Sequence, residues 1–481
     1  MLLVHVVDME IFSNEPSVVS LKQTLRILNP RPKSRLLNPD EFEKCSEPIR
    51  VSALELLSNY GSTLKMSKQN DETDKVKFST EEVMRRASAW FIEFPDRAFN
   101  PYSCGHDQEA KDIQLAHVLL ALAEKLNYQQ FESAGRLLSS CEWLAFPTGS
   151  AVERVVYHFA RALRERLDAE TGRRVRFKVL KHEVGLEMGS NLTSLACHQV
   201  IPFTQVTQFA AVQAILEAIG DKRSIHLIDF CVRSGVQWTG LMQALDQNHN
   251  ISHLKLTAVG VTNESQMEET GRQLESFAAT MRLKFQYMTI SIPNMFYLRK
   301  ELFQTDPEDI LVIYAPLVLR TMLHLPLSLE HLMRVIHSIN PDIMVVTEVE
   351  ADHNSPSFIK RFVEALFFYS AYFDCLEECM ERESECRMKV EARLSDGILN
   401  MVAAEGQERV TRNVKMEVWR AFFERFGMVE CEISEAVFCQ AKMVAGRFGC
   451  GGDCEVGKDG LSLMVAWKGT PIHSLSVWKF G

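Results

Sequence analysis

The chain has 481 residues, of which 46% are hydrophobic and 24% charged, and its formal net charge is −10 at pH 7. This composition is that of a globular protein with enough length for two or three domains or for one large domain with a lid. The sequence contains no run of about 18 apolar residues, which excludes a membrane-spanning helix. The apolar stretch Leu2–Val7 lacks a basic start and is followed by Asp8, so it does not fit a signal peptide. The negative charge disfavours strong unaided binding to nucleic acid, and we expect the chain in the cytosol or the nucleus.

The twelve cysteines are mostly isolated within apolar or helical patterns. Cys375, Cys379 and Cys386 lie on one predicted helix, and Cys450 and Cys454 flank a short glycine turn. Structural zinc sites instead show paired close spacings of their ligands. We therefore predict reduced thiols and no metal site.

Residues 1–105 are predicted to form a variable, partly disordered N-terminal arm. Short apolar patches alternate there with polar stretches, and the stretch from Lys65 to Lys77 has almost nothing to bury. The globular region is expected to begin near Asp107.

Two predicted helices follow, and each carries an apolar stripe. In the first, Leu115, Leu119, Leu122 and Leu126 recur at steps of three and four residues. The second helix repeats the pattern from Val152 to Leu167. Such a stripe can pack inside its own chain or form a dimer interface, and the spacing alone does not decide between the two.

The densest basic stretch of the chain runs from Arg161 to Lys181. Because clustered Lys and Arg side chains neutralise phosphates, its candidate DNA contacts are Arg173, Arg174, Arg176 and Lys178. Acidic residues interrupt the stretch, so a solvated helix face is the competing interpretation. Any DNA contact would then depend on a dimer or a partner protein.

Residues 224–245 predict a buried strand, a turn and a helix. The run Ile225-His226-Leu227-Ile228-Asp229-Phe230 is mostly apolar, as in a parallel strand that is covered on both faces. Gly235 then opens a helix whose buried face is lined by Trp238, Leu241, Met242 and Leu245. This is the first half of a βαβ unit, in which a cofactor would bind just beyond Asp229.

The turn after Asp229 lacks the composition of a cofactor site. A nucleotide-binding turn needs closely spaced glycines, whereas residues 230–236 contain only Gly235, and the side chains before it would crowd a ligand. The end of the second predicted strand offers no carboxylate for a ribose before Glu264. The chain also lacks a Gly-x-Ser-x-Gly elbow, and His226 lies within a strand. We therefore predict no cofactor, no catalytic residue and no enzymatic activity.

Later segments predict the rest of the sheet. Phe285–Ile292, Asp309–Tyr314 and Asp342–Glu348 are predicted strands separated by helices, and Leu461–Trp467 is a predicted hairpin strand after the turn Gly457-Lys458-Asp459-Gly460. The predicted class is α/β, with a doubly wound, mostly parallel sheet that resembles the methyltransferase Rossmann-like fold and carries an α-helical cap. The predicted core anchors are the tryptophans Trp238, Trp419, Trp467 and Trp478.

Four polar residues gather at the C-terminal end of one predicted strand: Glu348, Glu350, Asp352 and His353. Alternate strand positions face the same side, so the two glutamates could share a metal or an acid–base site. A hydrogen-bonded loop is the favoured interpretation of this cluster.

Ordered blocks along the chain resemble one family. Ile225–Phe230 followed by Gly235-Val236-Gln237-Trp238 resembles the signature of the GRAS family of plant transcriptional regulators, the scarecrow-like proteins. Further blocks of that family are matched, in the same order, by Pro202–Ala218, Leu254–Gly260, Trp419-Arg420, Trp467-Lys468-Gly469 and Ser476-Val477-Trp478. The chain departs from the family by Val477 in place of Ala and by Asp396-Gly397 in place of an Arg-Glu pair.

The resemblance covers roughly residues 106–481 and implies a GRAS-like domain. Its expected regions are a leucine-rich helical region (106–182), a signature block (190–262), a second leucine-rich region (263–310), an aromatic and strand-end region (311–404) and a closing block (405–481). It implies a nuclear transcriptional regulator of plant development or signalling that forms homo- or heterodimers with related GRAS proteins and binds other transcription factors or DNA. The alternative is a small-molecule-binding or methyltransferase-like enzyme that uses the strand-end cleft near Asp229.

Overall fold

The computed structural model describes residues 78–93, 107–173, 198–220, 222–247, 251–261, 264–382, 384–450 and 452–481. These residues form two compact units. The sheet unit contains the described residues of 198–351 and 413–481, and the helical unit contains those of 78–173 and 352–412. The chain therefore leaves the sheet unit after Ala351 and returns to it at Asn413.

The sheet unit alternates strands and helices. Its strands are β1 (Ser224–Asp229), β2 (His253–Val261), β3 (Lys284–Ile292), β4 (Ile310–Pro316), β5 (Ile343–Val349), β6 (Met428–Cys431), β7 (Cys454–Asp459), β8 (Ser462–Trp467) and β9 (Thr470–Phe480). Its α-helices are α7 (Pro202–Ala218), α8 (Val236–Gln247), α9 (Glu264–Ala278), α10 (Pro326–Ile339), α13 (Met416–Glu424) and α14 (Glu435–Ala445). Short 3₁₀ helices are η5 (Met295–Tyr297), η6 (Lys300–Phe303) and η7 (Leu319–Thr321).

The strands form one sheet in the order β3-β2-β1-β4-β5-β9-β8-β7, and β6 pairs with β9. Strands β1 to β5 are parallel neighbours in this order. The chain winds outward from β1 to β3 in one direction and from β4 to β5 in the other, which makes the sheet doubly wound. The predicted α/β class and the predicted strands at β3, β4 and β5 are therefore confirmed.

The C-terminal strands add an antiparallel half to the sheet. Strand β9 pairs with β5 along one edge, and its other edge is shared by β8 and β6. The predicted hairpin is present as β7 and β8, but the expected position of its turn was wrong. Gly457 to Asp459 belong to β7, and the chain reverses at Gly460, whose φ of 58° favours glycine.

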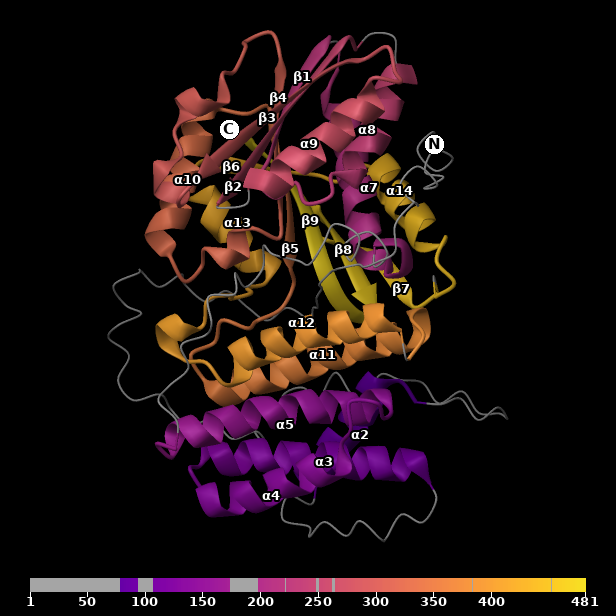
Figure 1. The fold of residues 1–481 in the computed structure, drawn as a ribbon, viewed down its shortest axis with the longest axis vertical. Coiled ribbons are helices and arrows are strands. Elements are labelled where there is room, and N and C mark those ends of the chain that lie inside the picture. The colour runs from indigo at the N-terminus through magenta and orange to yellow at the C-terminus, as the bar shows by residue number, and fades with distance from the viewer. Residues whose placement is uncertain are drawn as a thin grey trace. The chain divides into compact units, whose positions relative to one another are not determined.

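Helices cover both faces of the sheet (Figure 1). Helices α7, α8, α9 and α14 pack together on one face, while α10 and α13 cover the other. The core under α10 and α13 includes Ile313 of β4, Met344 of β5 and Trp478 of β9. All four tryptophans that the sequence assigns to the core are at most 2% exposed.

The helical unit is drawn from two segments of the chain (Figure 1). It contains α2 (Thr80–Glu93), α3 (Gln108–Asn127), α4 (Phe131–Leu144), α5 (Ala151–Glu170), α11 (Phe358–Cys379), α12 (Glu385–Val402) and the 3₁₀ helix η8 (Gly406–Glu408). Helix α2 lies inside the stretch 1–105 and buries Val83, Met84 and Phe91 in this unit, whereas Lys65–Lys77 lies outside the described residues. None of the helices in the described ranges of either unit is long and apolar enough to cross a membrane.

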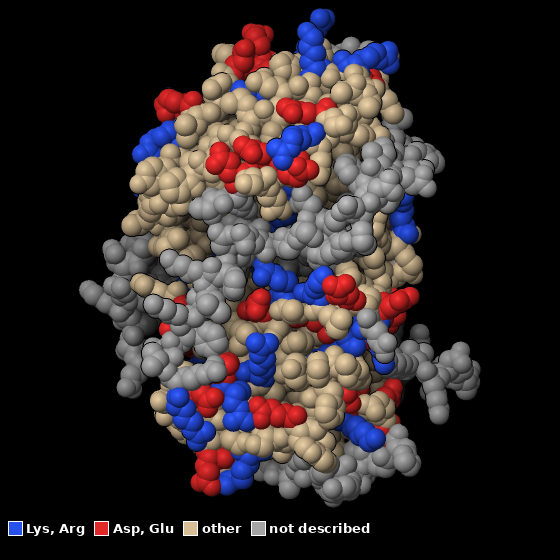
Figure 2. All heavy atoms as spheres, in the orientation of Figure 1, with Lys and Arg blue, Asp and Glu red and all other residues tan. Residues whose placement is uncertain are grey.

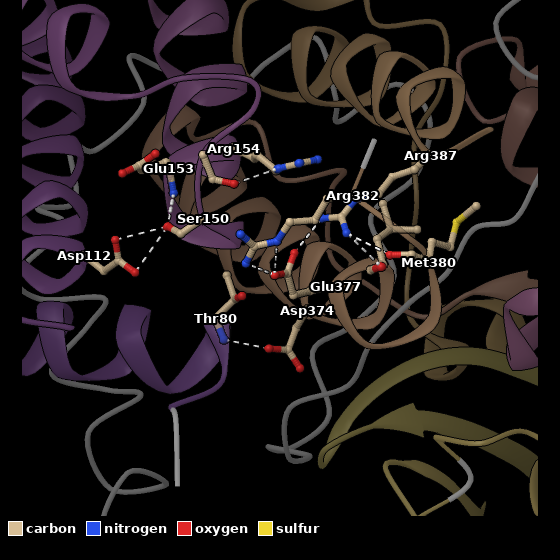
Figure 3. A network of polar contacts seen from close by, with 12 residues as sticks. Thr80, Asp112, Ser150, Glu153, Arg154, Asp374, Glu377, Met380, Arg382 and Arg387 are labelled. Atoms are coloured by element: carbon tan, nitrogen blue, oxygen red, sulfur yellow. Dashed lines mark hydrogen bonds and ion pairs between the residues drawn. The ribbon is translucent and has the colours of Figure 1, made fainter. Parts of the chain in front are cut away.

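Serine caps fix the starts of two of these helices. The hydroxyl of Ser150 accepts a hydrogen bond from Glu153 N at 3.2 Å and that of Ser384 accepts one from Arg387 N at 3.1 Å. Ser150 also donates to the buried Asp112 of α3, at 3.1 Å (Figure 3). The caps supply partners for backbone N–H groups that the first turn of a helix leaves unpaired.

A buried polar network joins α5, α11 and α12 (Figure 3). Oε1 of Glu391 accepts from Arg154 Nη1 at 2.6 Å and from Arg387 Nε at 2.8 Å. Arg387 also donates to Glu377 at 2.8 Å and to two carbonyls at the end of α11. Arg154 and Arg387 are at most 3% exposed, so Glu391, shared by both arginines, and Glu377 compensate two buried positive charges.

Candidate functional site

The signature segment places Asp229 where a doubly wound sheet normally holds its ligand. Strand β1 lies between β2 and β4, and Asp229 is its last residue. The crevice of such a sheet opens at the carboxyl ends of the strands where the winding direction reverses. Asp229 therefore stands at the position in which a cofactor enzyme would use a carboxylate.

Both carboxylate oxygens of Asp229 are engaged by its own chain. Oδ1 accepts a hydrogen bond from Cys231 N at 2.8 Å, and Oδ2 accepts one from Trp238 Nε1 at 2.8 Å. The Trp238 ring in turn lies edge-on to Tyr314 of β4, with 5.1 Å between the ring centres. Asp229 thus ties the turn after β1 to the first residues of α8.

The turn itself is closed by α9. Gly235 has a φ of 64°, and a Cβ atom there would lie 2.9 Å from Thr270 Cγ2 and 3.0 Å from Leu274 Cδ1. The hydroxyl of Thr270 donates a hydrogen bond to Arg233 O at 2.6 Å. Arg233 itself has a positive backbone φ of 47°. Gly235 is the only glycine of the turn, and it allows the turn before α8 to pack closely against α9. Its lack of a side chain is therefore explained by helix packing and not by a ligand.

The remaining space beside this turn is small. The cavity at the strand ends has a volume of about 20 Å³. Its described lining is Thr204, Thr207, Gln208, Cys231, Val232, Arg233, Gln237, Tyr314, Pro316, Leu317 and Thr347. Pockets for small ligands measure roughly 300–1,000 Å³, whereas about 20 Å³ holds one water molecule. Among the described residues, the cleft has no room for a dinucleotide or a methyl donor.

Replacing Asp229 by Asn should lower the free energy of unfolding by about 1–3 kcal/mol. The amide would turn an N–H group toward one of two N–H donors, and that donor would lose its acceptor. Chemical denaturation of Asp229→Asn, Trp238→Phe and the double variant measures the coupling energy between the Asp229 and Trp238 side chains. The cost of Asp229→Asn should shrink in the Trp238→Phe background, and equal costs in both backgrounds would contradict the assigned bond.

The two glutamates at the end of β5 have separate structural partners. Oε1 of Glu348 accepts from Leu319 N at 2.8 Å and from Arg320 N at 3.2 Å. The carboxylate of Glu350 accepts from Met416 N at 3.0 Å. The two carboxylates therefore bind the starts of η7 and α13. No group of three or more His, Cys, Asp or Glu side chains in the described ranges is arranged to hold a metal ion.

Burial raises the pKa of each of these carboxyl groups, to about 7 for Asp229 and Glu348 and to about 8 for Glu350. A carboxyl whose pKa is higher in the folded than in the unfolded chain lowers stability as the pH rises above its unfolded pKa. For Glu350 this loss accumulates between pH 4.5 and about pH 8. The three groups together favour the folded chain at mildly acidic pH.

The free energy of unfolding of the Glu350→Gln variant should therefore rise, relative to that of the parent chain, as the pH is raised from 5 to 8. The amide removes the titration, so the difference in unfolding free energy should shift by up to about 1.4 kcal/mol per pH unit. Urea denaturation at each pH measures it. The exposed Glu455→Gln is the matched control. A pH-independent difference for Glu350→Gln would rule out the raised pKa.

The leucine stripe of α3 is buried. Leu115 is 5% exposed and Leu119, Leu122 and Leu126 are at most 1% exposed. Helix α3 packs against α2, α4 and α5 of the helical unit. The stripe thus lies in the interior of the folded chain, and an interface with a second chain would have to use other side chains.

The basic stretch is described only as far as Arg173, while Arg174, Arg176 and Lys178 lie outside the described residues. Arg173 is 67% exposed and lies 3.9 Å from a carboxylate oxygen of Asp168. The preceding Arg164 pairs with Glu142 of α4. Figure 2 shows Lys and Arg side chains interspersed with Asp and Glu on the visible face of the helical unit. This mixed charge resembles a solvated helix surface more than a continuous phosphate-binding face.

Known proteins resemble this chain over most of its length. The model of the GRAS domain family matches residues 115–479. DELLA protein GAIP of Cucurbita maxima is 29% identical over 381 residues, 78% of this chain and 64% of that protein. DELLA protein 2 of Medicago truncatula is 30% identical over 409 residues, 84% of this chain and 74% of that protein. The match to GAIP thus spans less than two thirds of that relative.

A solved structure, SCL7 of Oryza sativa, has the same fold. It superposes with a TM-score of 0.67 at 24% identity and covers 76% of this chain and 99% of that chain. The family match extends from α3 to the last residues of β9 and includes the signature segment around Asp229. This chain therefore belongs to the GRAS domain family.

Proposed function

We propose that this chain is a nuclear transcriptional regulator, in plant development or signalling, that acts by binding other proteins. Its partners are related GRAS proteins, in homo- or heterodimers, and other transcription factors. The observation that supports this most directly is the closed turn after β1, where Asp229 is engaged by Cys231 and Trp238 and about 20 Å³ remains. In this proposal the sheet unit is a scaffold whose surface binds other proteins.

Light scattering on the full chain tests the dimer, with one matched variant in each unit. Leu327 of α10 is 69% exposed and Trp143 of α4 is 67% exposed, so Leu327→Asp and Trp143→Asp leave the buried cores unchanged. We expect the parent chain to show the mass of a dimer, and one variant to reduce it to a monomer. A monomeric parent chain that also captures no related GRAS protein would refute the proposal.

Direct DNA contact is the second route, through Arg173, Arg174, Arg176 and Lys178. A gel shift with the parent chain and the exposed Arg173→Glu variant tests it, because one lost phosphate contact weakens binding and lowers its salt dependence.

Calorimetric titration with S-adenosylmethionine tests the enzyme alternative. Binding of that methyl donor would show that the cleft near Asp229 opens, and it would favour the methyltransferase-like function.

A further inference from the structure

Strand β3 forms one end of the sheet, and its outer edge is open. In the described ranges β3 pairs only with β2, in a parallel register that is continuous from Lys284 to Ile292. The N–H group of Lys284 points toward β2, because it donates to Ser252 O at 3.1 Å. Successive residues of a strand turn their backbone groups to alternate sides. The backbone groups that face outward are therefore those of Phe285, Tyr287, Thr289 and Ser291.

These outward N–H and C=O groups have no hydrogen-bond partner among the residues that the structure describes. Such a row of unpaired groups is a template onto which another strand can pair. Proteins usually block an edge of this kind with charged residues, proline or a β-bulge. Strand β3 has nine residues, a single charged residue at its start, Lys284, and neither a proline nor a shift of register.

The opposite end of the sheet, strand β7, is blocked by charged residues. Half of its six residues are charged: Glu455, Lys458 and Asp459. Lys458 pairs with Glu435 at 2.7 Å, and Asp459 pairs with Arg420 at 3.0 Å. The sheet therefore protects the edge of β7 and leaves the edge of β3 open to a further strand.

Helix α9 packs on one face of β3, and one of its carboxylates lies close to this strand (Figure 1). The hydroxyl of Tyr287 donates a hydrogen bond to Met267 O of α9 at 2.8 Å. Burial, followed by the charges of Asp229 and Glu275, raises the pKa of Tyr287. Glu275 is thus near enough to influence a β3 side chain, which places it on the side of α9 that faces β3.

The side of α9 that contains Glu275 is acidic. The exposed Glu264, Glu268 and Glu275 follow one another at four and seven residues, so they lie on one side of the helix. None of the three forms an ion pair with a described residue. The only basic residue of α9, Arg272, pairs with Glu269 at 2.6 Å. Two copies of this chain paired symmetrically through β3 would bring these carboxylates together, so the charge favours a basic partner.

The opposite face of β3 has a different character. Side chains alternate along a strand, and Ile290 and Ile292 belong to the core under α10. Lys284, Gln286 and Met288 are at the same spacing and point to that face. A basic side chain of a partner would meet the exposed Lys284 there, whereas an apolar one would extend the half-buried Met288. A strand that fits this edge thus carries basic residues on the α9 face and apolar residues on the other.

We propose that the open edge of β3 binds an extended segment of a partner protein in which basic and apolar residues alternate. The segment adds one strand to the sheet through the outward backbone groups of β3, and its Lys or Arg side chains pair with the carboxylates of α9. This inference rests on the protein-binding role proposed above and names the chemistry of one partner. The two can fail separately, because light scattering reports the dimer and a peptide reports only this edge.

Fluorescence anisotropy of the full chain with a labelled Lys-Val-Lys-Val-Lys-Val-Lys peptide tests the site. Thr289→Pro removes one outward N–H group, at a position where an edge strand tolerates proline, and should weaken binding on the order of tenfold, which is about 1.4 kcal/mol. Thr289→Ala keeps that group and should bind like the parent chain. Glu268→Gln with Glu275→Gln should also weaken binding, whereas Glu132→Gln with Glu385→Gln, the same change of charge at exposed positions elsewhere, should not.

Altered peptides test the mode of binding without changing the protein. Methylation of the backbone nitrogens of either all lysines or all valines removes the N–H groups from one edge of the peptide. One of these two peptides should lose binding: the first if the added strand is antiparallel to β3, the second if it is parallel. The peptide Lys-Lys-Lys-Lys-Val-Val-Val has the same composition without the alternation and should bind at least about tenfold more weakly.

Equal binding of this last peptide, or full binding of both methylated peptides, would overturn the proposal, because only attraction to the net charge of −10 would remain. Equal weakening by the Glu132 and Glu385 control would overturn it for the same reason. Light scattering on Thr289→Pro tests the competing occupant. A parent dimer that this variant converts to a monomer would show that a second copy of the chain occupies the edge, and it would also overturn the proposal.

Discussion

Glu391→Gln is expected to lower the free energy of unfolding by about 3–5 kcal/mol, which is a large part of the stability of a typical domain. The amide keeps the shape of the side chain but removes the charge that Arg154 and Arg387 share at 2.6 and 2.8 Å. The guanidinium group of Arg154, 3% exposed, would then lose its carboxylate partner, and that of Arg387, 0% exposed, would keep only Glu377, which it shares with Arg382. Thermal unfolding followed by circular dichroism measures the loss of helix.

The matched control lies on the same helix. Glu385 is 74% exposed and pairs with Lys389 at the surface, so Glu385→Gln should change stability by no more than about 0.5 kcal/mol. Adding Arg154→Met to Glu391→Gln should recover part of the loss, because one uncompensated charge is removed. If Glu391→Gln and Glu385→Gln unfold at the same temperature, the network does not hold α5 and α12 together.

Trp478→Ala is expected to cost about 3–5 kcal/mol in the sheet unit. The Trp478 side chain is 1% exposed, and its ring centre lies 4.8 Å from that of Phe423 of α13. Its Nε1 donates to Ser476 Oγ at 2.8 Å, so the substitution removes both packing and a buried hydrogen bond. The change empties a large volume where β5, β6 and β9 meet.

Differential scanning calorimetry compares Trp478→Ala with Trp143→Ala. Trp143 is 67% exposed, so its truncation should leave the unfolding temperature nearly unchanged. The two variants make the same chemical change, once at a buried tryptophan and once at an exposed one. Equal unfolding temperatures for the two variants would show that β9 contributes little to the core.

Local patterns predicted the centre of the sheet well. The apolar run of β1, the glycine at 235 and the helical spacing of Trp238 and Leu241 specify a strand, a turn and a helix within about twenty residues. The crowding of the turn was also predictable, because Phe230 to Arg233 leave no glycines for a ligand. The bond from Trp238 to Asp229 was not, since spacing places a side chain on a face but does not orient its N–H group.

Other features depend on contacts between distant parts of the chain. Arg154 and Glu391 are 237 residues apart, so no window of sequence reveals their ion pair. Strand β6 has four residues and too little alternation to be recognised, and its partner β9 begins about forty residues later. The polar stretch Asp352–Ser357 indicates a loop after Ala351, but its composition does not indicate that the chain passes into a second unit there. The stripe of α3 was recognised, but a stripe contains no information about which chain covers it.

The position of β9 sets the order in which the sheet unit can be completed during synthesis. Strand β5 obtains its second neighbour only when residues 470–480 are available, and before then β8 can pair only with β7, while β6 still lacks the strand with which it pairs. While the ribosome makes the segment after β5, that strand presents unpaired N–H and C=O groups along one edge. A stop codon anywhere before residue 470 would make this exposed edge permanent, and such a shortened product should be prone to aggregation and a target for chaperones and proteases.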